Sequence, residues 1–389
     1  MDHRSAYLDH AASSPMRAEA FEAMVPHLRD EFANPSGSHA PARRARLALD
    51  EARDVIAECL GADAGEIVAT SGGTESDTSA LVGALSRHAR TSGVPALAVC
   101  PAAEHHAVRE VVEANDGIVV PVTSTGAVDL DALAEALTTH GDRVAVVSVM
   151  AVNNELGTVT ELAEVAATVR RCAPGALLHT DAVQAAMWLD LRSVTAHVDL
   201  LSLSAHKFGG PKGVGVLWIR RGVAIDPLVR GGGQERDRRS GTQNVAGVVG
   251  AATALRLTDE DRPTIVASLT VLRDRLLDGL IACGAIETVP RSVRVAGNAH
   301  VCFPGLESEE LLYLLDRDGV SASAASACAS GAIEASHVLR AIAVSEELRR
   351  GALRLTLGHT TTAADVDHAL AVVAGAVARL RDHRARQAS

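Results

Sequence analysis

A lysine follows directly on an apolar run in the segment SLSAHKFGGPKGVG, residues 202–215. Ser204 ends the run, and His206 and Lys207 come just before a glycine-rich turn. A lysine at the end of a buried strand is expected to lose its hydration, which favours the neutral amine and makes it available for Schiff-base chemistry. The spacing alone is equally compatible with a solvated lysine in a surface turn.

An aspartate closes another strand-like run, in HTDAVQA at residues 179–185. There the carboxylate of Asp181 would meet a ligand that lies over the edge of a sheet. In pyridoxal-phosphate enzymes an aspartate with this role keeps the pyridine nitrogen protonated, so that the ring can accept electrons. Gln184 lies one helical turn further on and could donate to a ring hydroxyl. The structural alternative is an aspartate that caps a helix.

A third segment, TSGGTES at residues 70–76, joins a strand to a helix. Free backbone N–H groups at a helix N-terminus attract phosphate, Gly73 permits close approach, and the hydroxyl of Thr74 is a further donor. Turns of this kind are common, so the motif alone is weak evidence for a phosphate site.

Three more polar side chains follow strand-like runs or lie within them. His105, in EHH (104–106), could stack on an aromatic cofactor and move protons, although a hydrogen-bonded structural role is the alternative. Asn154, in NNELG (153–157), offers an amide donor. Arg354, in GALRLTLG, has the planar fork that suits bidentate capture of a substrate carboxylate.

A single thiol, Cys328, lies in the segment SASAASACASGA, residues 321–332. Packed structural cysteines usually have branched apolar neighbours, and zinc-binding cysteines usually have a second Cys or His close by. Cys328 has neither. The other five cysteines lie in helical or strand-like contexts and are expected to be inert. Because no C-x-x-C occurs, neither a disulfide framework nor a metal site is expected.

Apolar runs that alternate with amphipathic segments must position these side chains. Such alternation, with strands that are apolar almost throughout, is typical of an α/β fold whose mostly parallel sheet is covered by helices on both faces. Ligands of such sheets bind beyond the carboxyl ends of the strands. The predicted strands are residues 66–70, 96–100, 117–122, 143–150, 176–180, 199–204 and 213–219, with helices at 129–137 and 160–172 among them.

The pattern changes near residue 256 and predicts a second, smaller α+β domain. A long helical pattern at 264–283 leads to a strand at 299–303 and a helix at 307–319. A second strand at 353–357 and a final helix at about 363–383 follow.

The composition limits the kinds of partner. With 389 residues, 47% of them hydrophobic, the chain can bury a large core. A net charge of −11 and only 2% aromatic residues disfavour direct contact with nucleic acid. No apolar run reaches the roughly 18 residues of a membrane span. A soluble, cytoplasmic protein without a membrane partner is expected.

Taken in order along the chain, these segments resemble the cysteine desulfurases (NifS/IscS-like), pyridoxal-phosphate enzymes of the class V aminotransferase superfamily with fold type I. The resemblance covers nearly the whole chain. It rests on YLDHAAS, NPSGSH, TSGGTES, EHHAV, VNNELG, HTDAVQ, SAHKFGGPKG, GGGQERDRRSGTQN, SACAS and LRLTLG.

The resemblance implies a seven-stranded large domain (14–255) that binds pyridoxal 5'-phosphate. It implies a small domain (1–13 and 256–389) that carries the catalytic cysteine on a mobile loop at about 321–332. Lys207 would form the Schiff base with the cofactor, while His105 would stack on its ring and assist proton transfer. The remaining implied cofactor ligands are Asp181 at the pyridine nitrogen, Gln184 at the ring hydroxyl, and Gly73, Thr74, Ser204 and His206 at the phosphate.

The resemblance also implies an obligate homodimer, because Thr242 matches a residue that reaches the neighbouring subunit's phosphate. Asn34, Asn154 and Arg354 would hold the substrate, L-cysteine. Cys328 would take its sulfur as a persulfide, leaving L-alanine. The sulfur would then pass to an acceptor protein. Iron–sulfur scaffolds, tRNA thiolation proteins, DNA sulfur-modification machinery and thio-cofactor pathways can all draw on this class of enzyme.

Departures from the family pattern are modest. SAHK replaces the commoner SGHK, and His359 follows LTLG where arginine is usual. The residues leave open a selenocysteine lyase, another aminotransferase-like enzyme of fold type I, and an inactive sulfur-relay scaffold. They do not identify the acceptor.

Overall fold

The largest sheet of the computed structural model contains seven strands, and each lies on one of the predicted apolar runs. The structure describes residues 5–324 and 336–388. The strands are β2 (Ile67–Thr70), β3 (Leu97–Pro101), β4 (Ile118–Val120), β5 (Val144–Ser148), β6 (Leu177–Asp181), β7 (Leu200–Ser204) and β8 (Gly215–Ile219). Their order is β2-β8-β7-β6-β5-β3-β4, and only β8 runs antiparallel to its neighbours. The predicted mostly parallel, seven-stranded α/β sheet is confirmed.

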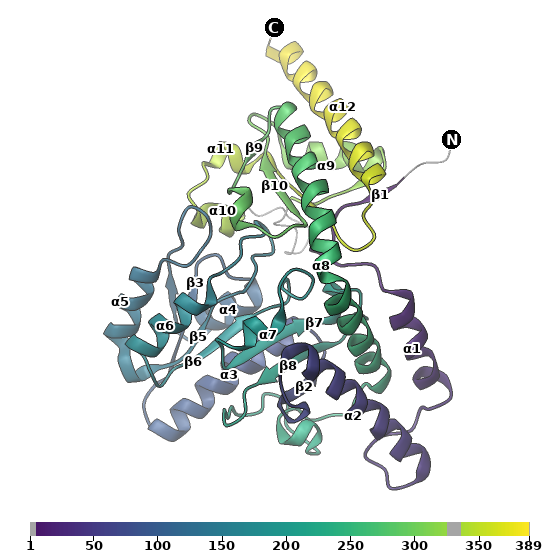
Figure 1. Cartoon of the computed structure of the whole chain (residues 1–389). Helices are drawn as coiled ribbons and strands as arrows, with labels where there is room; N and C mark the ends of the chain where they lie inside the picture. Colours follow the sequence, from purple (N-terminus) through teal and green to yellow (C-terminus); the bar gives the residue numbers. More distant parts are fainter. Residues whose placement is uncertain (1–4, 325–335, 389) are drawn as a thin grey trace.

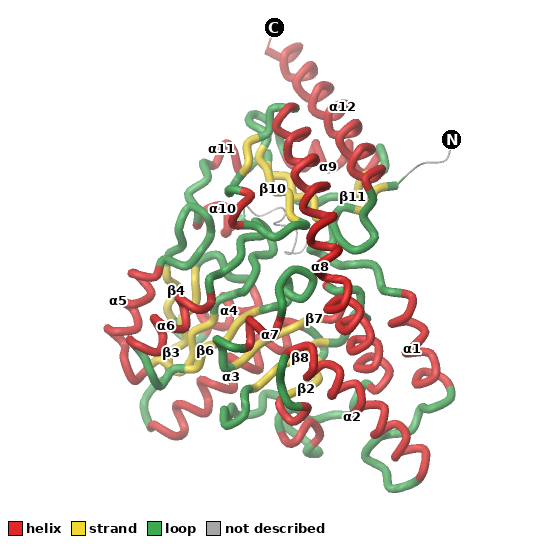
Figure 2. Tube along the Cα trace, viewed as in Figure 1, coloured by secondary structure: helices red, strands yellow, loops and turns green. Residues whose placement is uncertain are grey.

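Helices cover both faces of this sheet (Figures 1 and 2). Alternate side chains of a strand point to opposite faces, so Val146 packs with one layer of helices and Val147 with the other. The first layer contains α3 (Gly73–Ser92) and α4 (His106–Ala114). The second contains α2 (Ala40–Leu60), α5 (Leu130–His140), α6 (Leu162–Cys172), α7 (Leu191–Thr195) and the first part of α8 (Val245–Ala282), while α1 (Ala18–Arg29) packs on α8.

The smaller part of the chain is built on a three-stranded antiparallel sheet. Its strands are β9 (Ile286–Glu287), β10 (Asn298–Cys302) and β12 (Ala352–Thr356), with β10 in the centre. The N-terminal strand β1 (Ala6–Tyr7) pairs with β11 (Val320–Ser321) in a separate two-stranded sheet. The helices are α9 (Ser308–Arg317), α10 (His337–Ala341), α11 (Glu346–Arg349) and α12 (Ala363–Ala388).

A single helix, α8, joins the two parts, and here the predicted element boundaries were wrong. The sequence predicted a helix at 264–283 after a domain boundary at 255, whereas α8 continues without interruption through the boundary and through Pro263. Leu255 packs in the core of the large part, and Leu276 packs in the core of the small part. The charged stretch before Pro263 obscured this continuity in the sequence. The division into domains 14–255 and 1–13 with 256–389 stays a prediction, with which these separate cores are consistent.

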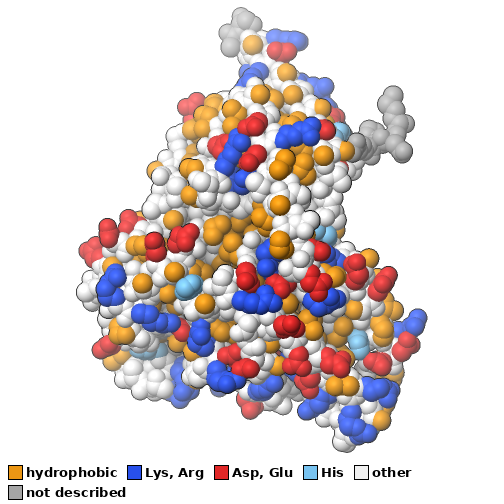
Figure 3. Space-filling model, viewed as in Figure 1, with side chains coloured by type: hydrophobic (Ala, Val, Ile, Leu, Met, Phe, Trp, Pro, Cys, Tyr) orange, Lys and Arg blue, Asp and Glu red, His pale blue; other side chains and the backbone are white. Residues whose placement is uncertain are grey.

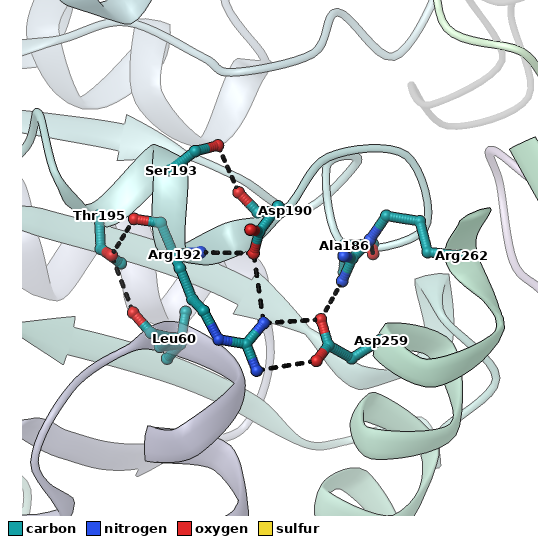
Figure 4. Close-up of polar contacts among 8 residues, drawn as sticks. All are labelled: Leu60, Ala186, Asp190, Arg192, Ser193, Thr195, Asp259 and Arg262. Carbon is teal, nitrogen blue, oxygen red and sulfur yellow. Dashed lines mark hydrogen bonds and ion pairs between the residues drawn. The ribbon is translucent and has the colours of Figure 1, made fainter.

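A network of charged side chains ties α7 to α8 (Figure 4). Arg192 donates to both oxygens of Asp259, from Nη1 at 3.1 Å and from Nη2 at 2.9 Å. Arg262 donates to the same carboxylate. The hydroxyl of Thr195 donates to the carbonyl of Leu60 at 2.8 Å, which brings in the end of α2. Nε of Arg262 also donates to the carbonyl of Ala186 at 3.4 Å, so the segment between β6 and α7, which carries Gln184, is tied to the long helix as well.

Charged side chains of both signs are interspersed over the face shown in Figure 3. Hydrophobic side chains gather between the larger, lower part and the upper part on this face. Among the described residues, no helix is both long enough and apolar enough to cross a bilayer.

Candidate active site

A cavity of about 420 Å³ lies between the large sheet and the small part of the chain. This volume is in the usual range for small-molecule sites. Ten of the residues predicted to act at the site line this cavity: Gly73, Thr74, His105, Asn154, Asp181, Gln184, Ser204, His206, Lys207 and Arg354. They come from six separate segments of the sequence, five of which meet at one edge of the large sheet, while the sixth, with Arg354, belongs to the small part.

Lys207 lies at the end of a short 3-10 turn directly after β7. Its Nζ donates to two backbone carbonyls of the N-terminal segment, to Ala11 at 2.5 Å and to Ala12 at 2.9 Å. The amine is therefore held at the cavity wall by neutral acceptors. Lys207 and Lys212 are the only lysines in the sequence.

Asp181 is the last residue of β6, and its side chain is buried. Its Oδ1 accepts a hydrogen bond from the backbone N–H of Val183 at 2.9 Å. Burial raises the pKa of Asp181, while the neighbouring His105, the Val183 amide and Lys207 oppose the shift. A buried carboxylate that accepts this single hydrogen bond from the described residues is suited to receive a cationic N–H from a ligand in the cavity.

His105 caps the N-terminus of α4, and its Nδ1 accepts from the backbone N–H of Ala107 at 3.1 Å. With Nδ1 used as an acceptor, the proton of the neutral ring is on Nε2. Burial lowers the pKa of His105. The negative charge of Asp181 opposes this shift, and the positive charge of Lys207 adds to it. The ring is therefore neutral at physiological pH and has one N–H to donate.

The start of α3 forms one end of the cavity. The first N–H groups of a helix have no partner within the helix, and Gly73 and Thr74 are the first two residues of α3. A Cβ on Gly73 would come within 2.7 Å of a methyl of Val183, so only glycine allows this close approach. Ser204 and His206 lie beside this turn, and burial lowers the pKa of His206 to about 4, with help from Lys207 and Lys212.

Arg354 lies at the other end of the cavity, on β12 of the small part. Its Nη1 donates to the backbone carbonyl of Asn154 at 2.8 Å, and its Nη2 donates to Asp9 at 2.9 Å. Gln184 donates from Nε2 to the carbonyl of Ala11 at 2.8 Å. Three predicted residues are thus held by the segment around Asp9 to Ala12, which the sequence reasoning had noted only as part of the YLDHAAS motif.

A buried polar row behind Asp181 was also missed. His179 is completely buried and hydrogen bonds through Nδ1 to Ser148 at 2.8 Å and through Nε2 to Ser202 at 3.0 Å. Asp77, one turn into α3, lies 3.6 Å from Nε2 of His179. Burial is the main cause that raises the pKa of Asp77, and the negative charge of Asp181 raises it further. The only sequence signal was that these polar residues occur in otherwise apolar segments.

Two predicted residues do not line the cavity. Asn34 is exposed in the loop between α1 and α2, where its Oδ1 accepts from the backbone N–H of Ser36. Thr242 is exposed before α8. Their neighbours Pro35, Ser36 and Gln243 line a separate polar depression of about 450 Å³. The roles of Asn34 and Thr242 stay predictions.

Cys328 lies outside the described residues, as does most of the predicted loop 321–332. The beginning of that predicted loop belongs to regular structure instead. Ser321 is in β11, and Ser323 exchanges two backbone hydrogen bonds with Arg354, at 2.7 and 3.1 Å. The residues just before the unassigned segment are therefore tied to the strand that carries the arginine.

The cavity residues fit pyridoxal 5'-phosphate. The α3 turn with its glycine suits a phosphate, the under-bonded buried carboxylate of Asp181 suits a protonated ring nitrogen, and Lys207 supplies the amine.

Comparison with known proteins agrees with this chemistry. A family model, aminotransferase class-V, matches residues 6–369. An IscS-like cysteine desulfurase of Mycobacterium tuberculosis is 44% identical over 97% of this chain and 97% of the relative. A cysteine desulfurase IscS of Dictyoglomus turgidum is 41% identical over 97% of this chain and 96% of the relative.

Solved structures show the same fold. A NifS-like protein superposes with a TM-score of 0.89 at 33% identity, covering 96% of this chain and 100% of the other. A structure described as SspA in complex with cysteine has a TM-score of 0.76 at 29% identity, covering 91% and 99%.

The fold and the site therefore agree with the match to the aminotransferase class-V family, and the chain belongs to this family. Within the family its relatives place it among the cysteine desulfurases. These enzymes depend on pyridoxal 5'-phosphate, which is the cofactor of this chain.

Lys207→Ala should remove the visible absorbance that the cofactor shows when it is bound covalently to the enzyme. Borohydride reduction of the wild-type holoenzyme should fix the cofactor on the peptide containing Lys207. Lys212→Ala is the matched control, because it removes the only other lysine and should leave both signals unchanged. Covalent labelling of Lys212 in the wild type would contradict the assignment.

Proposed function

We propose that this chain removes sulfur from L-cysteine, releases L-alanine and passes the sulfur through Cys328 to an acceptor protein. The observation that carries the proposal is that Lys207, Asp181 and Arg354 line one cavity, at the edge where β6 and β7 end. Relatives that cover nearly the whole chain at 41–44% identity are named as cysteine desulfurases.

The cofactor is held at three places in this proposal. The N–H groups of Gly73 and Thr74, with Ser204 and His206, bind the phosphate. Asp181 would keep a proton on the ring nitrogen, Gln184 would meet the ring hydroxyl, and His105 would lie against the ring. Lys207 would hold the cofactor covalently. When bound, pyridoxal 5'-phosphate supplies an electron sink for the charge that develops at the substrate Cα.

Arg354 orients the substrate by binding its carboxylate, with Asn154 beside it. Lys207 takes the proton from Cα of the bound substrate. His105 is less suited as that base, because its Nδ1 is used to cap α4 and its Nε2 already carries a proton. We assign to His105 a hydrogen bond donated from Nε2 to the reacting groups, because full loss of that proton from a neutral ring would leave an imidazolate anion.

Sulfur transfer completes the reaction. The thiolate of Cys328 attacks the substrate sulfur, an S–S bond forms, and the C–S bond breaks with its electrons going to Cβ. Protons added at Cβ and at Cα give L-alanine, and Cys328 is left as a persulfide. Forming the S–S bond oxidises sulfur by two electrons, and Cβ takes up these electrons when its C–S bond is replaced by a C–H bond, so the step needs no external oxidant.

The finer assignments belong to the same proposal. We infer a cytoplasmic homodimer in which Thr242 reaches the partner's phosphate site and Asn34 assists substrate binding. The acceptor is an iron–sulfur scaffold or a protein of tRNA thiolation, since relatives carry the name IscS. No direct nucleic-acid or membrane partner is proposed.

Cys328→Ser should abolish the formation of sulfide and alanine from L-cysteine, because a hydroxyl cannot accept the sulfur. The cofactor spectrum should be unchanged. Cys172→Ser, which alters a partly buried cysteine at the end of α6, is the control and should keep full activity. Sulfide release that survives in Cys328→Ser would refute the proposal. A keto acid in place of alanine would indicate an aminotransferase, and strong preference for selenocysteine would indicate a lyase.

Mixed dimers test the role of Thr242 across the subunit interface. Thr242→Ala should weaken cofactor binding, and Lys207→Ala should inactivate its own subunit. A dimer with one subunit of each kind should regain one complete site, because Lys207 and Thr242 are then intact in the same pocket. Co-expression with two purification tags isolates this hybrid. A hybrid no more active than the two parents would show that Thr242 does not act in trans.

A further inference from the structure

Asp9 lies beside the strand that carries Arg354. The N-terminal segment runs parallel to β12 here, with Asp9 opposite Thr356. The N–H of Thr356 donates to the carbonyl of Leu8 at 2.7 Å, and the N–H of His10 donates to the carbonyl of Thr356 at 3.3 Å. The backbone of Asp9 is therefore fixed, so its side chain reaches the cavity wall from a defined place.

The guanidinium of Arg354 is held at two points. Asp9 Oδ1 lies 2.9 Å from Nη2, and the carbonyl of Asn154 lies 2.8 Å from Nη1. The side chain of Arg354 is 5% exposed and that of Asp9 is 20% exposed, so water screens the pair only weakly. Nε of Arg354 has no hydrogen-bond partner in the part of the chain that the structure describes. The two acceptors use only two of the five N–H groups of the guanidinium, so donors of the fork are left for a ligand.

We propose that Asp9 is a positioning residue for the substrate carboxylate, acting through Arg354. A long arginine side chain has many rotamers, and ordering it on binding would cost free energy. Asp9 and the Asn154 carbonyl fix the fork before the substrate arrives. This inference rests on the proposed binding of the carboxylate by Arg354.

The same segment also holds the catalytic lysine. Two residues after Asp9, the carbonyl of Ala11 accepts from both Lys207 and Gln184, and the carbonyl of Ala12 accepts from Lys207. One short stretch of backbone therefore sets the positions of the carboxylate-binding arginine and the cofactor-binding lysine relative to each other.

Asp9→Ala in the holoenzyme should raise the KM for L-cysteine about tenfold or more, with kcat within about threefold of wild type. Binding of L-alanine, followed by the change in cofactor absorbance, should weaken by a similar factor. Asp9→Asn keeps a hydrogen-bond acceptor and should give an intermediate rise of about threefold in KM. The matched control is Glu310→Ala, which breaks an exposed carboxylate–arginine pair of the same 2.9 Å length with Arg384 and should change nothing.

Cysteamine, which lacks the carboxylate, separates positioning from a merely structural role. Its binding to the holoenzyme should be the same in wild type and in Asp9→Ala. Equal weakening of cysteamine and L-alanine, or an unchanged KM for L-cysteine, would overturn the inference. If Asp9→Ala does not fold, the binding of cysteamine and L-alanine is compared in Asp9→Asn instead. A KM of Asp9→Asn for L-cysteine equal to that of the wild type would then overturn the inference.

Arg354→Ala distinguishes the inference from the proposed function. If Arg354→Ala leaves the KM for L-cysteine unchanged, the carboxylate assignment fails and the inference fails with it. If Arg354→Ala raises the KM while Asp9→Ala does not, only the role of Asp9 is overturned.

Discussion

The contacts of residues 9–12 with Lys207 and Arg354 are the interaction on which the site depends. Lys207 belongs to the large sheet and Arg354 to the small one, so neither sheet alone fixes the distance between them. The N-terminal segment pairs with β12 and also places two carbonyls at Nζ of Lys207. In the proposed roles, Lys207 holds the cofactor and Arg354 binds the substrate carboxylate, so both can act on one substrate molecule only if this distance is maintained.

The second constraint is the cost of burying charge. Asp77, Glu104 and Asp181 are buried near one another, and burial raises the pKa of each, with mutual repulsion adding to the shift of Asp77 and Glu104. His105 and Lys207 oppose the shift only at Asp181. Asp181 is therefore the carboxylate best able to carry a negative charge next to a cationic ring nitrogen. The neighbouring acids can stay protonated without a cation of their own.

Much of this arrangement could be predicted from the sequence, because it follows from short-range patterns. Apolar runs predicted all seven strands of the large sheet, and polar residues placed after those strands, such as Asp181 and Lys207, do meet at its edge. Contacts between distant segments could not be predicted. Asp9 and Arg354 are far apart along the chain, and neither residue type is unusual where it stands. The bounds of helix α8 were predicted wrongly because a charged stretch precedes Pro263, where the helix passes from one core to the other.

The most direct test of the account is to locate the sulfur after one turnover. Holoenzyme is mixed with L-cysteine without reductant or acceptor, and the L-alanine formed is quantified. The mass of the tryptic peptide from Asp318 to Arg340, whose only cysteine is Cys328, is then measured by mass spectrometry. The account predicts one alanine per active subunit and a mass increase of one sulfur atom on this peptide. Alanine formed while the peptide stays unmodified, or extra sulfur on another cysteine instead, would contradict it.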